Sequence, residues 1–321
     1  MKNTIAKTSL LIVSVLVFLA LLEGATQVYV YRIAKRGKLF APDTVTGWSV
    51  KPLIQMQRQN ADGDLWSIET DSSGFRGDSY WDSNKKRVLI LGDSFAFGEG
   101  VDLEERFDTT IEELGYSVLN TGVMGYGTDQ QFLKARPYLD QLNRGDATIV
   151  LTYYNDIHDI TRKRQSGRAK PWYDIDDGRL RLHRPEITAR EKLRDNSYIY
   201  ALLGSLLERR QEVSDAAIIQ ASNIYRMIIE NEARELAEKG VLMILAYHGE
   251  AIVENLTHRK QINETLSATC ENTHVHCLDI DQHFDVDNND DYFLADGHWN
   301  ERGHEAAGGL LAEVLSGIVP R

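Results

Sequence analysis

The stretch Val88-Leu89-Ile90-Leu91-Gly92-Asp93-Ser94-Phe95 decides both the expected fold and the place of its chemistry. Its four aliphatic residues are apolar on both faces, which is typical of a strand buried within a parallel sheet. A Gly-Asp-Ser turn follows at once, so Ser94 lies just beyond the carboxyl end of that strand. Open α/β sheets bind their ligands at this edge. A serine placed there can act as a nucleophile if a base and an oxyanion hole reach it.

The rest of the chain alternates predicted strands and helices. Apolar, partly β-branched runs predict further strands at residues 116–120, 147–152, 241–246 and 275–280, and helices are expected at residues 103–114, 129–142, 216–239 and 301–315. This alternation predicts an α/β fold with a parallel sheet of about five strands covered by helices on both faces.

Two segments lie outside this alternation of strands and helices. Residues 39–86 are mixed and aromatic, and we expect an ordered lead-in packed on a domain formed by residues 87–321. Residues 157–215 form a polar and basic insertion. An insertion of this length is either a lid or substrate-recognition element or a solvated excursion, and the sequence leaves both open. His158 and Asp159, at its start, are expected to be solvated.

The first 38 residues have the character of a membrane segment. Residues 9–22 are an uncharged run, and its extension to Tyr31, interrupted by Glu23, is long enough to span a bilayer. A cleaved signal peptide is the alternative, but no small-x-small cleavage site follows the run and no lipoprotein cysteine is present. We therefore expect a retained single-pass anchor, with the bulk of the chain outside the cytoplasm, periplasmic or extracellular.

The charge distribution excludes one class of partner. The formal net charge is −12, and residues 1–38 carry six basic residues against one acidic residue, a balance of +5, so the remainder carries −17. A domain this acidic is unsuited to nucleic acid, whose phosphates require clustered Lys and Arg. It would also repel a polyanionic glycan in the absence of a local basic patch.

The two cysteines, Cys270 and Cys277, enclose six residues that include His274 and His276. In an oxidising compartment they could close a small loop, as a disulfide, or remain as two thiols. Zinc is the alternative, but the Cys-x6-Cys spacing matches no common finger. We expect neither a metal nor a cofactor.

Three polar constellations follow other predicted strands or precede the last helix. These are Asn120-Thr-Gly-Val-Met-Gly-Tyr-Gly127, Tyr153-Tyr154-Asn155-Asp156 and Asp296-Gly297-His298-Trp299-Asn300. Glycines let a backbone N–H approach a developing oxyanion, a side-chain amide can donate to it, and a His beside a carboxylate can serve as an oriented base. Each piece alone more often marks a turn or a helix cap, but their order along the chain makes a stronger signal.

With these motifs the sequence resembles the SGNH hydrolases, also called the GDSL family of esterases and lipases, over residues 87 to about 315. Gly92-Asp93-Ser94 is similar to the first block of that family, Asn120-x-Gly122-x-x-Gly125 to the second, Tyr154-Asn155-Asp156 to the third, and Asp296 with His298 to the last. The longer strings around the first two blocks resemble a bacterial subgroup whose members often carry an N-terminal hydrophobic segment. The resemblance implies a flavodoxin-like three-layer α/β/α fold.

The resemblance also implies a role for each matching residue. Ser94 would be the nucleophile and His298 its general base, with Asp296 orienting the imidazole. The oxyanion hole would consist of the backbone N–H groups of Ser94 and Gly125 and the side-chain amide of Asn155.

Two positions depart from the usual pattern. The last block is usually Asp-x-x-His, but Ala295 stands three residues before His298, and the carboxylate, Asp296, stands two before it. The resulting Asp-x-His-Trp resembles the SGNH-like O-acetyltransferases of exported polysaccharides. The third block also lacks its usual glycine, because Tyr153 stands there.

These features predict a serine-dependent ester hydrolase that acts on acylated glycans or other cell-envelope esters. The alternatives are an O-acetyltransferase of an exported polysaccharide and a non-catalytic polysaccharide-binding accessory protein. Two further histidines are expected to lie outside the catalytic group. His304 is expected to be structural, and His248, after the fourth core strand, could line a pocket, although the motif alone favours a structural place.

Overall fold

Five strands form one parallel sheet at the centre of the computed structural model, which describes residues 2–29, 38–77, 80–82, 84–207, 213–250, 253–271, 274–284 and 291–319. The strands are β5 (Arg87–Leu91), β6 (Ser117–Asn120), β7 (Ala147–Tyr153), β12 (Leu242–His248) and β13 (Val275–Asp279). Their order is β6-β5-β7-β12-β13, and all neighbours are parallel. This is the flavodoxin-like order, whose topological switch point lies between β5 and β7.

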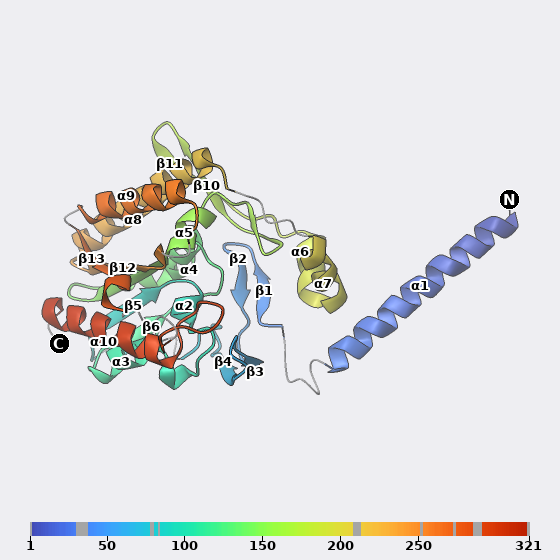
Figure 1. The fold of residues 1–321 in the computed structure, drawn as a ribbon, viewed down its shortest axis with the longest axis horizontal. Helices are drawn as coiled ribbons and strands as arrows, with labels where there is room; N and C mark the ends of the chain where they lie inside the picture. The colour runs from blue at the N-terminus through green and yellow to red at the C-terminus, as the bar shows by residue number, and fades with distance from the viewer. Residues whose placement is uncertain are drawn as a thin grey trace.

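Helices cover both faces of this sheet (Figure 1). One face carries α4 (Thr128–Leu139), α5 (Tyr154–Asp159), α8 (Asp215–Lys239) and α9 (Leu256–Cys270), and the other carries α3 (Phe107–Glu113) and α10 (Glu301–Ile318). Successive strand residues supply the two cores, since Leu89 and Leu91 pack with the first group and Val88 and Ile90 with the second. The predicted three-layer α/β/α fold is confirmed.

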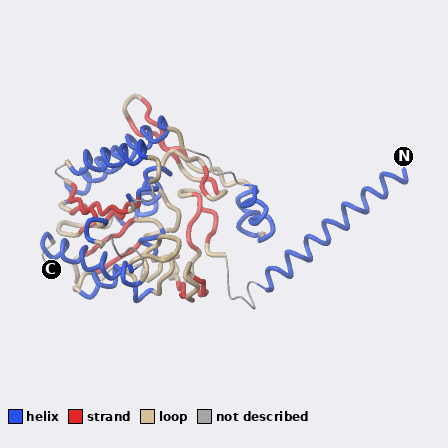
Figure 2. The backbone as a smooth tube through the Cα atoms, viewed as in Figure 1, coloured by secondary structure: helices blue, strands red, loops and turns tan. Residues whose placement is uncertain are grey.

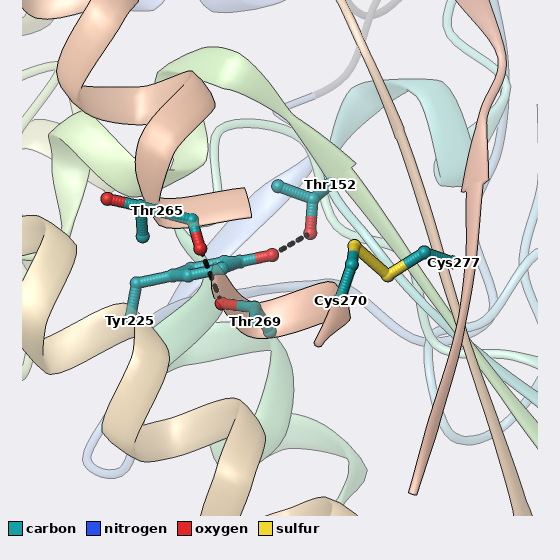
Figure 3. The surroundings of a disulfide bond; sticks show 6 residues. All are labelled: Thr152, Tyr225, Thr265, Thr269, Cys270 and Cys277. Atoms are coloured by element: carbon teal, nitrogen blue, oxygen red, sulfur yellow. Dashed lines mark hydrogen bonds between the residues drawn. A yellow bond between two sulfur atoms is a disulfide. The ribbon is translucent and has the colours of Figure 1, made fainter. Parts of the chain in front are cut away.

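Sequence patterns did not reveal α9, which covers β13. The segment is rich in threonine and polar residues, and Ile262 and Leu266 are its fully buried aliphatic residues. Its last residue, Cys270, forms a disulfide with Cys277 in β13 (Figure 3). Figure 3 also shows Tyr225 of α8, whose hydroxyl lies 3.2 Å from Thr152 Oγ1 at the end of β7. The disulfide decides between the two sequence alternatives, and it is typical of an oxidising compartment.

The lead-in segment consists of two antiparallel hairpins, β1 (Phe40–Asp43) with β2 (Gly47–Val50) and β3 (Gln55–Gln59) with β4 (Leu65–Glu69). They form a third core cluster with the loops that follow β5 and β6. Arg76, 3% exposed, strengthens this contact by donating to the carbonyls of Phe97, Gly98, Val101 and Ser67. The lead-in therefore supports the loops at the carboxyl edge of the sheet.

The described part of the insertion, residues 157–207 and 213–215, is folded and partly buried. It contains β8 (Arg164–Gln165), β9 (Arg168–Ala169), β10 (Trp172–Asp176), β11 (Arg179–His183), α6 (Ala189–Asn196) and α7 (Tyr198–Leu207). Lys170 is fully buried, with Nζ 2.6 Å from Asp129 Oδ2 and donating to the Asp159 carbonyl. The expectation that Asp159 is solvated was wrong, because its carboxylate is 5% exposed and pairs with Arg162. Short-range sequence patterns do not reveal such partners.

The N-terminal helix α1 (Lys2–Val28) projects away from the body of the molecule (Figure 2). Its segment Ala6–Val28 is long and apolar enough to cross a membrane, and none of it is buried against the rest of the chain. At 1.5 Å per residue its 23 residues extend about 35 Å, compared with about 30 Å of bilayer hydrocarbon.

Candidate active site

Ser94 opens the short helix α2 (Ser94–Phe97) at the carboxyl end of β5. The turn requires glycine at position 92, because a Cβ there would lie 2.5 Å from the Ala96 Cβ. Asp93 caps the helix by accepting from the Phe95 N–H at 3.0 Å. Burial raises the pKa of Asp93 to about 6. The strand, glycine and cap together fix the direction of the Ser94 side chain.

His298 reaches Ser94 from the other end of the chain. Its Nε2 lies 2.9 Å from Ser94 Oγ. The histidine lies on a tight loop in which Leu294 N–H donates to the His298 carbonyl at 2.7 Å, and Gly297 adopts a φ of +88°. The next residue, Trp299, is fully buried and packs edge-on against Phe95, with ring centroids 5.0 Å apart. Burial of Trp299 thus holds its neighbour His298 over the serine.

Asp296 lies beside the other ring nitrogen of His298. Its Oδ1 is 3.1 Å from Nδ1 and also accepts from the His298 N–H at 3.2 Å. The Asp296 side chain is 46% exposed, and Nδ1 makes no well-aligned hydrogen bond with any described residue. The carboxylate is therefore within reach of Nδ1 and partly hydrated.

The expected oxyanion donors lie on the two loops next to Ser94. Val123 N–H donates to the Gly92 carbonyl at 3.2 Å, which holds the loop after β6 against the serine turn. On this loop Gly125 has a φ of +76°, and its N–H has no acceptor among the described residues. Asn155 is the second residue of α5, which follows β7, and its Oδ1 is buried without a hydrogen-bond partner among the described residues. Neither residue is hydrogen-bonded to Ser94 or His298.

Glu99 is a residue of this site that the sequence analysis missed. Its Oε2 lies 3.8 Å from His298 Nε2, and its Oε1 lies 3.7 Å from an Arg58 guanidinium nitrogen. Burial raises the pKa of Glu99 above its ordinary value, while His298 and Arg58 oppose the shift. Its flanking glycines, Gly98 and Gly100, have φ of +76° and +96°. These two glycines were the available sequence signal, since they mark a sharp turn five residues after the serine.

The lead-in segment contacts the loops that carry these groups. Arg58 on β3 faces Glu99, and Asn60 donates to the Gly100 carbonyl at 3.2 Å. Asp62 accepts from the Ala295 N–H at 2.9 Å, next to Asp296. Trp48 Nε1 donates to the carbonyl of Met124, which precedes Gly125. The site is thus built from both the α/β domain and the lead-in.

His248, for which the sequence favoured a structural place over a pocket wall, has that structural place. The side chain is completely buried, and neither ring nitrogen has a hydrogen-bond partner. It packs among Phe95, Tyr153 and Trp299, with ring centroids 4.3–4.9 Å away. Burial lowers its pKa well below the usual value, which keeps the imidazole neutral. His248 is part of the aromatic layer beneath the site.

His304 has the expected structural surroundings. It is 1% exposed, stacks on Phe107, and its Nδ1 accepts from the Phe107 N–H at 3.4 Å. Burial lowers its pKa to about 3, so it is neutral at physiological pH.

Comparison with known proteins gives structural likenesses at low identity. No protein-family model and no curated protein matches the sequence. A lipolytic protein of the G-D-S-L family from Desulfitobacterium hafniense is 15% identical, with a TM-score of 0.44 over 72% of this chain and 99% of that one. A psychrotrophic esterase, EstA, from Pseudoalteromonas (12%, 0.41, 72% and 97%) and a family 3 carbohydrate esterase from Clostridium thermocellum (12%, 0.41, 73% and 96%) are also similar.

Proposed function

We propose that this protein is a membrane-anchored, serine-dependent esterase of the SGNH type that acts on acylated glycans or other cell-envelope esters. The observation that carries the proposal is the 2.9 Å contact between Ser94 Oγ and His298 Nε2 at the switch point of the sheet. A serine and an imidazole at this distance can transfer a proton as the serine attacks.

The reaction would proceed through an acyl-enzyme. Ser94 Oγ forms a bond to the ester carbonyl carbon as Nε2 of His298 takes the serine proton. The tetrahedral intermediate then collapses, the bond to the alkoxy oxygen breaks, and His298 returns the proton to the leaving alcohol. A water molecule, deprotonated by the same imidazole, then attacks the acyl carbon. The bond from that carbon to Ser94 Oγ breaks, the acid leaves, and His298 returns the proton to the serine. The Asp296 carboxylate, 3.1 Å from Nδ1, would stabilise the imidazolium in both halves of the reaction.

The negative charge that forms on the carbonyl oxygen of the ester must be stabilised by hydrogen-bond donors at the carboxyl edge of the sheet, near Ser94. The backbone N–H groups of Ser94 and Gly125 and the amide of Asn155 would supply them. The absence of a competing acceptor for the Gly125 N–H within the described residues supports this assignment.

Asn155→Ala should lower kcat by about 10²–10³-fold with little change in KM, because an oxyanion donor acts mainly in the transition state. Steady-state hydrolysis of a p-nitrophenyl acetate series measures both constants. Asn143→Ala, in a turn at the opposite end of β7, serves as the control. A raised KM at unchanged kcat would instead make Asn155 a ground-state contact.

Glu99 would act as a positioning residue that stabilises the imidazolium from the Nε2 side. Because burial raises its pKa, its carboxylate is protonated at low pH and becomes charged only above the ordinary Glu range. The stabilisation of the His298 imidazolium by Glu99 should therefore be absent at low pH and should appear as the pH rises.

Glu99→Gln should leave kcat/KM unchanged at the acid end of the pH profile and lower it about two- to fivefold at neutral pH, as expected for an ion pair worth about 0.5–1 kcal/mol. Glu99→Asp should recover part of the loss. A Gln variant whose deficit is the same at every pH would show that Glu99 acts through shape alone.

A second candidate is acyl transfer to a sugar hydroxyl in place of water. The favouring observation is the two-residue spacing of Asp296 and His298, followed by Trp299, which resembles the O-acetyltransferases. Adding a neutral oligosaccharide to the esterase assay distinguishes the two, because a transferase produces acylated sugar at the expense of free acid. The non-catalytic alternative is disfavoured, since a binding module does not need a serine in contact with a histidine.

We further propose that α1 is retained as a membrane anchor and that the catalytic domain lies outside the cytoplasm. The length of the apolar segment Ala6–Val28 and the Cys270–Cys277 disulfide both support this. A reporter that is active only in the cytoplasm, fused after Arg321, should give no signal in cells. The same reporter fused after Lys7 should be active, and strong activity of the Arg321 fusion would contradict the proposed orientation.

A further inference from the structure

An uncharged helix of the insertion lies beside the proposed anchor. Helix α7, Tyr-Ile-Tyr-Ala-Leu-Leu-Gly-Ser-Leu-Leu over Tyr198–Leu207, contains no charged residue. None of its side chains described in the structure, residues 198–204, is buried, and Leu203 is 52% exposed. A helix that is apolar all round and lies outside the protein core is unfavourable in water and typical of contact with lipid.

The first turn of α7 is bound by a carboxylate from α1. Glu23 accepts hydrogen bonds from the N–H groups of Tyr198 and Ile199, at 2.9 and 3.0 Å, and from Ser197 Oγ at 2.7 Å. These donors include N–H groups that a helix leaves unsatisfied at its N-terminus. Gln27, one turn further along α1, donates to the Asn196 carbonyl at 3.3 Å. The two helices are therefore joined by polar contacts at one end of each.

Glu23 is an energetically unfavourable residue within a membrane-spanning segment. It is the one acidic residue between Ala6 and Val28, about 7 Å before the end of the helix. A charge within a bilayer span is unfavourable unless it is paired, and such a residue usually has a specific partner. Here the partner is the N-terminus of α7. If the two stay together, α7 lies at the depth of the last turns of α1.

The polar helix α6 connects α7 to the catalytic domain. Its Glu191 and Asp195 are buried and pair with Arg164 at 2.7 Å and Arg168 at 3.1 Å, both within the insertion. Lys38, where the chain leaves the anchor region, donates to the Arg194 carbonyl at 3.2 Å and lies over the Tyr198 ring. Figure 1 shows α6 and α7 between the body of the protein and the end of α1. The charged helix thus faces the protein and the uncharged helix faces the anchor.

We propose that α7 is a second membrane contact, an interfacial helix that inserts its apolar residues into the bilayer beside α1 and is held there by Glu23. This goes beyond the proposed esterase activity and rests on retention of α1. With two membrane contacts, the catalytic domain would have a fixed orientation towards the lipid surface. With α1 alone, it would be tethered without a fixed orientation.

The test uses the full chain reconstituted in phosphatidylcholine–phosphatidylglycerol nanodiscs, with lipids brominated near the headgroup or deep in the acyl chain. Leu203→Trp reports on α7, Phe18→Trp on α1, and Ile175→Trp, on a hairpin of the insertion, is the exposed control. The tryptophan fluorescence of the wild-type chain, which has five tryptophans, is subtracted from that of each variant. All three variants should hydrolyse a soluble ester at the wild-type rate, which verifies the fold.

We expect lipids brominated near the headgroup to abolish most of the added emission of Leu203→Trp and none of that of Ile175→Trp. Addition of Glu23→Gln to Leu203→Trp should restore most of the emission. If Phe18→Trp is quenched but Leu203→Trp is quenched no more than the control, the proposed insertion of α7 into the bilayer is wrong, and the membrane anchor α1 is supported. The same result would be seen if α7 were buried against a second copy of the chain, and it would contradict the proposed contact with lipid. If Phe18→Trp is not quenched either, the anchor itself is wrong. Unchanged quenching after Glu23→Gln would overturn the role of Glu23.

Discussion

Replacing Ser94 with alanine is expected to lower the rate of short-chain aryl ester hydrolysis by about 10⁶-fold, the loss typical of a catalytic serine. The oxygen removed is the atom that would form the covalent bond, and no neighbouring group can replace it. The fold should survive, because the Ser94 side chain hydrogen-bonds only to His298 and Asp93 among the described residues. Helix α2 retains its cap, since Asp93 accepts from the Phe95 N–H and not from an atom that the substitution removes.

The measurement compares Ser94→Ala with the wild type and with Ser72→Ala, an exposed serine in a turn of the lead-in. Near-UV circular dichroism and thermal unfolding verify that all three are folded. A folded Ser94→Ala within tenfold of the wild-type rate would refute the nucleophile assignment, because residual catalysis by the oxyanion hole alone is far smaller.

Asp296→Asn should lower kcat by roughly 10³-fold, somewhat less than the 10⁴-fold loss seen when a buried triad aspartate is replaced. The carboxylate lies 3.1 Å from His298 Nδ1, so it can hold the tautomer in which Nε2 is free to accept the serine proton. The amide can present an N–H to Nδ1 and favour the wrong tautomer. The effect should be smaller than that of a buried aspartate, because the side chain is 46% exposed and water can partly replace it.

His298→Ala, measured on the same ester, separates a triad from a dyad. Some SGNH enzymes orient the histidine with a backbone carbonyl, but no carbonyl of the described residues is hydrogen-bonded to Nδ1. We therefore expect the alanine variant to be inactive and Asp296→Asn to be strongly impaired. A folded Asp296→Asn that loses less than tenfold beside an inactive His298→Ala would show that Asp296 is only a turn residue.

The parts of the fold that the sequence predicted are those with local signals. Residues 88–91 are apolar on both faces, and a buried parallel strand, β5, includes them. The long helix α8 has regular apolar spacing and ends at Gly240 in the left-handed conformation. Helix α4 was also predicted despite Pro137, and it contains that proline. In each case, the pattern within the element itself determines its structure.

The elements that the sequence did not predict depend on contacts far away along the chain. Helix α9 is polar, and its His258 Nε2 lies 3.0 Å from Oδ1 of Asp215, 43 residues earlier in α8. Asp159 was expected to be solvated, yet it is buried beside Lys170, which donates to its carbonyl and pairs with Asp129, 41 residues earlier in the chain. Such partners become visible only when the chain is folded.

The candidate site divides in the same way. Ser94, Asn155 and His298 were proposed from the sequence because each stands in a motif beside a predicted element, and the structure brings Ser94 and His298 within 2.9 Å of each other. Glu99 was missed because its place beside His298 depends on two left-handed glycines and on Arg58 from the lead-in. For His248 the sequence left a pocket wall open beside a structural place, because the end of a central strand can point into a cleft as well as into an aromatic layer.

The central claim is that Ser94 is a nucleophile activated by His298, and an alkyl fluorophosphonate tests it most directly. Ser94 Oγ would attack phosphorus, fluoride would leave, and His298 would take the proton, which gives a stable phosphonyl serine. Intact mass and peptide mapping of the full chain should locate one adduct, on Ser94. The adduct should be absent from Ser94→Ala and formed very slowly by His298→Ala, whereas Ser72→Ala should react like the wild type. Failure of the folded wild-type chain to react, or an adduct on another residue that persists in Ser94→Ala, would contradict the account.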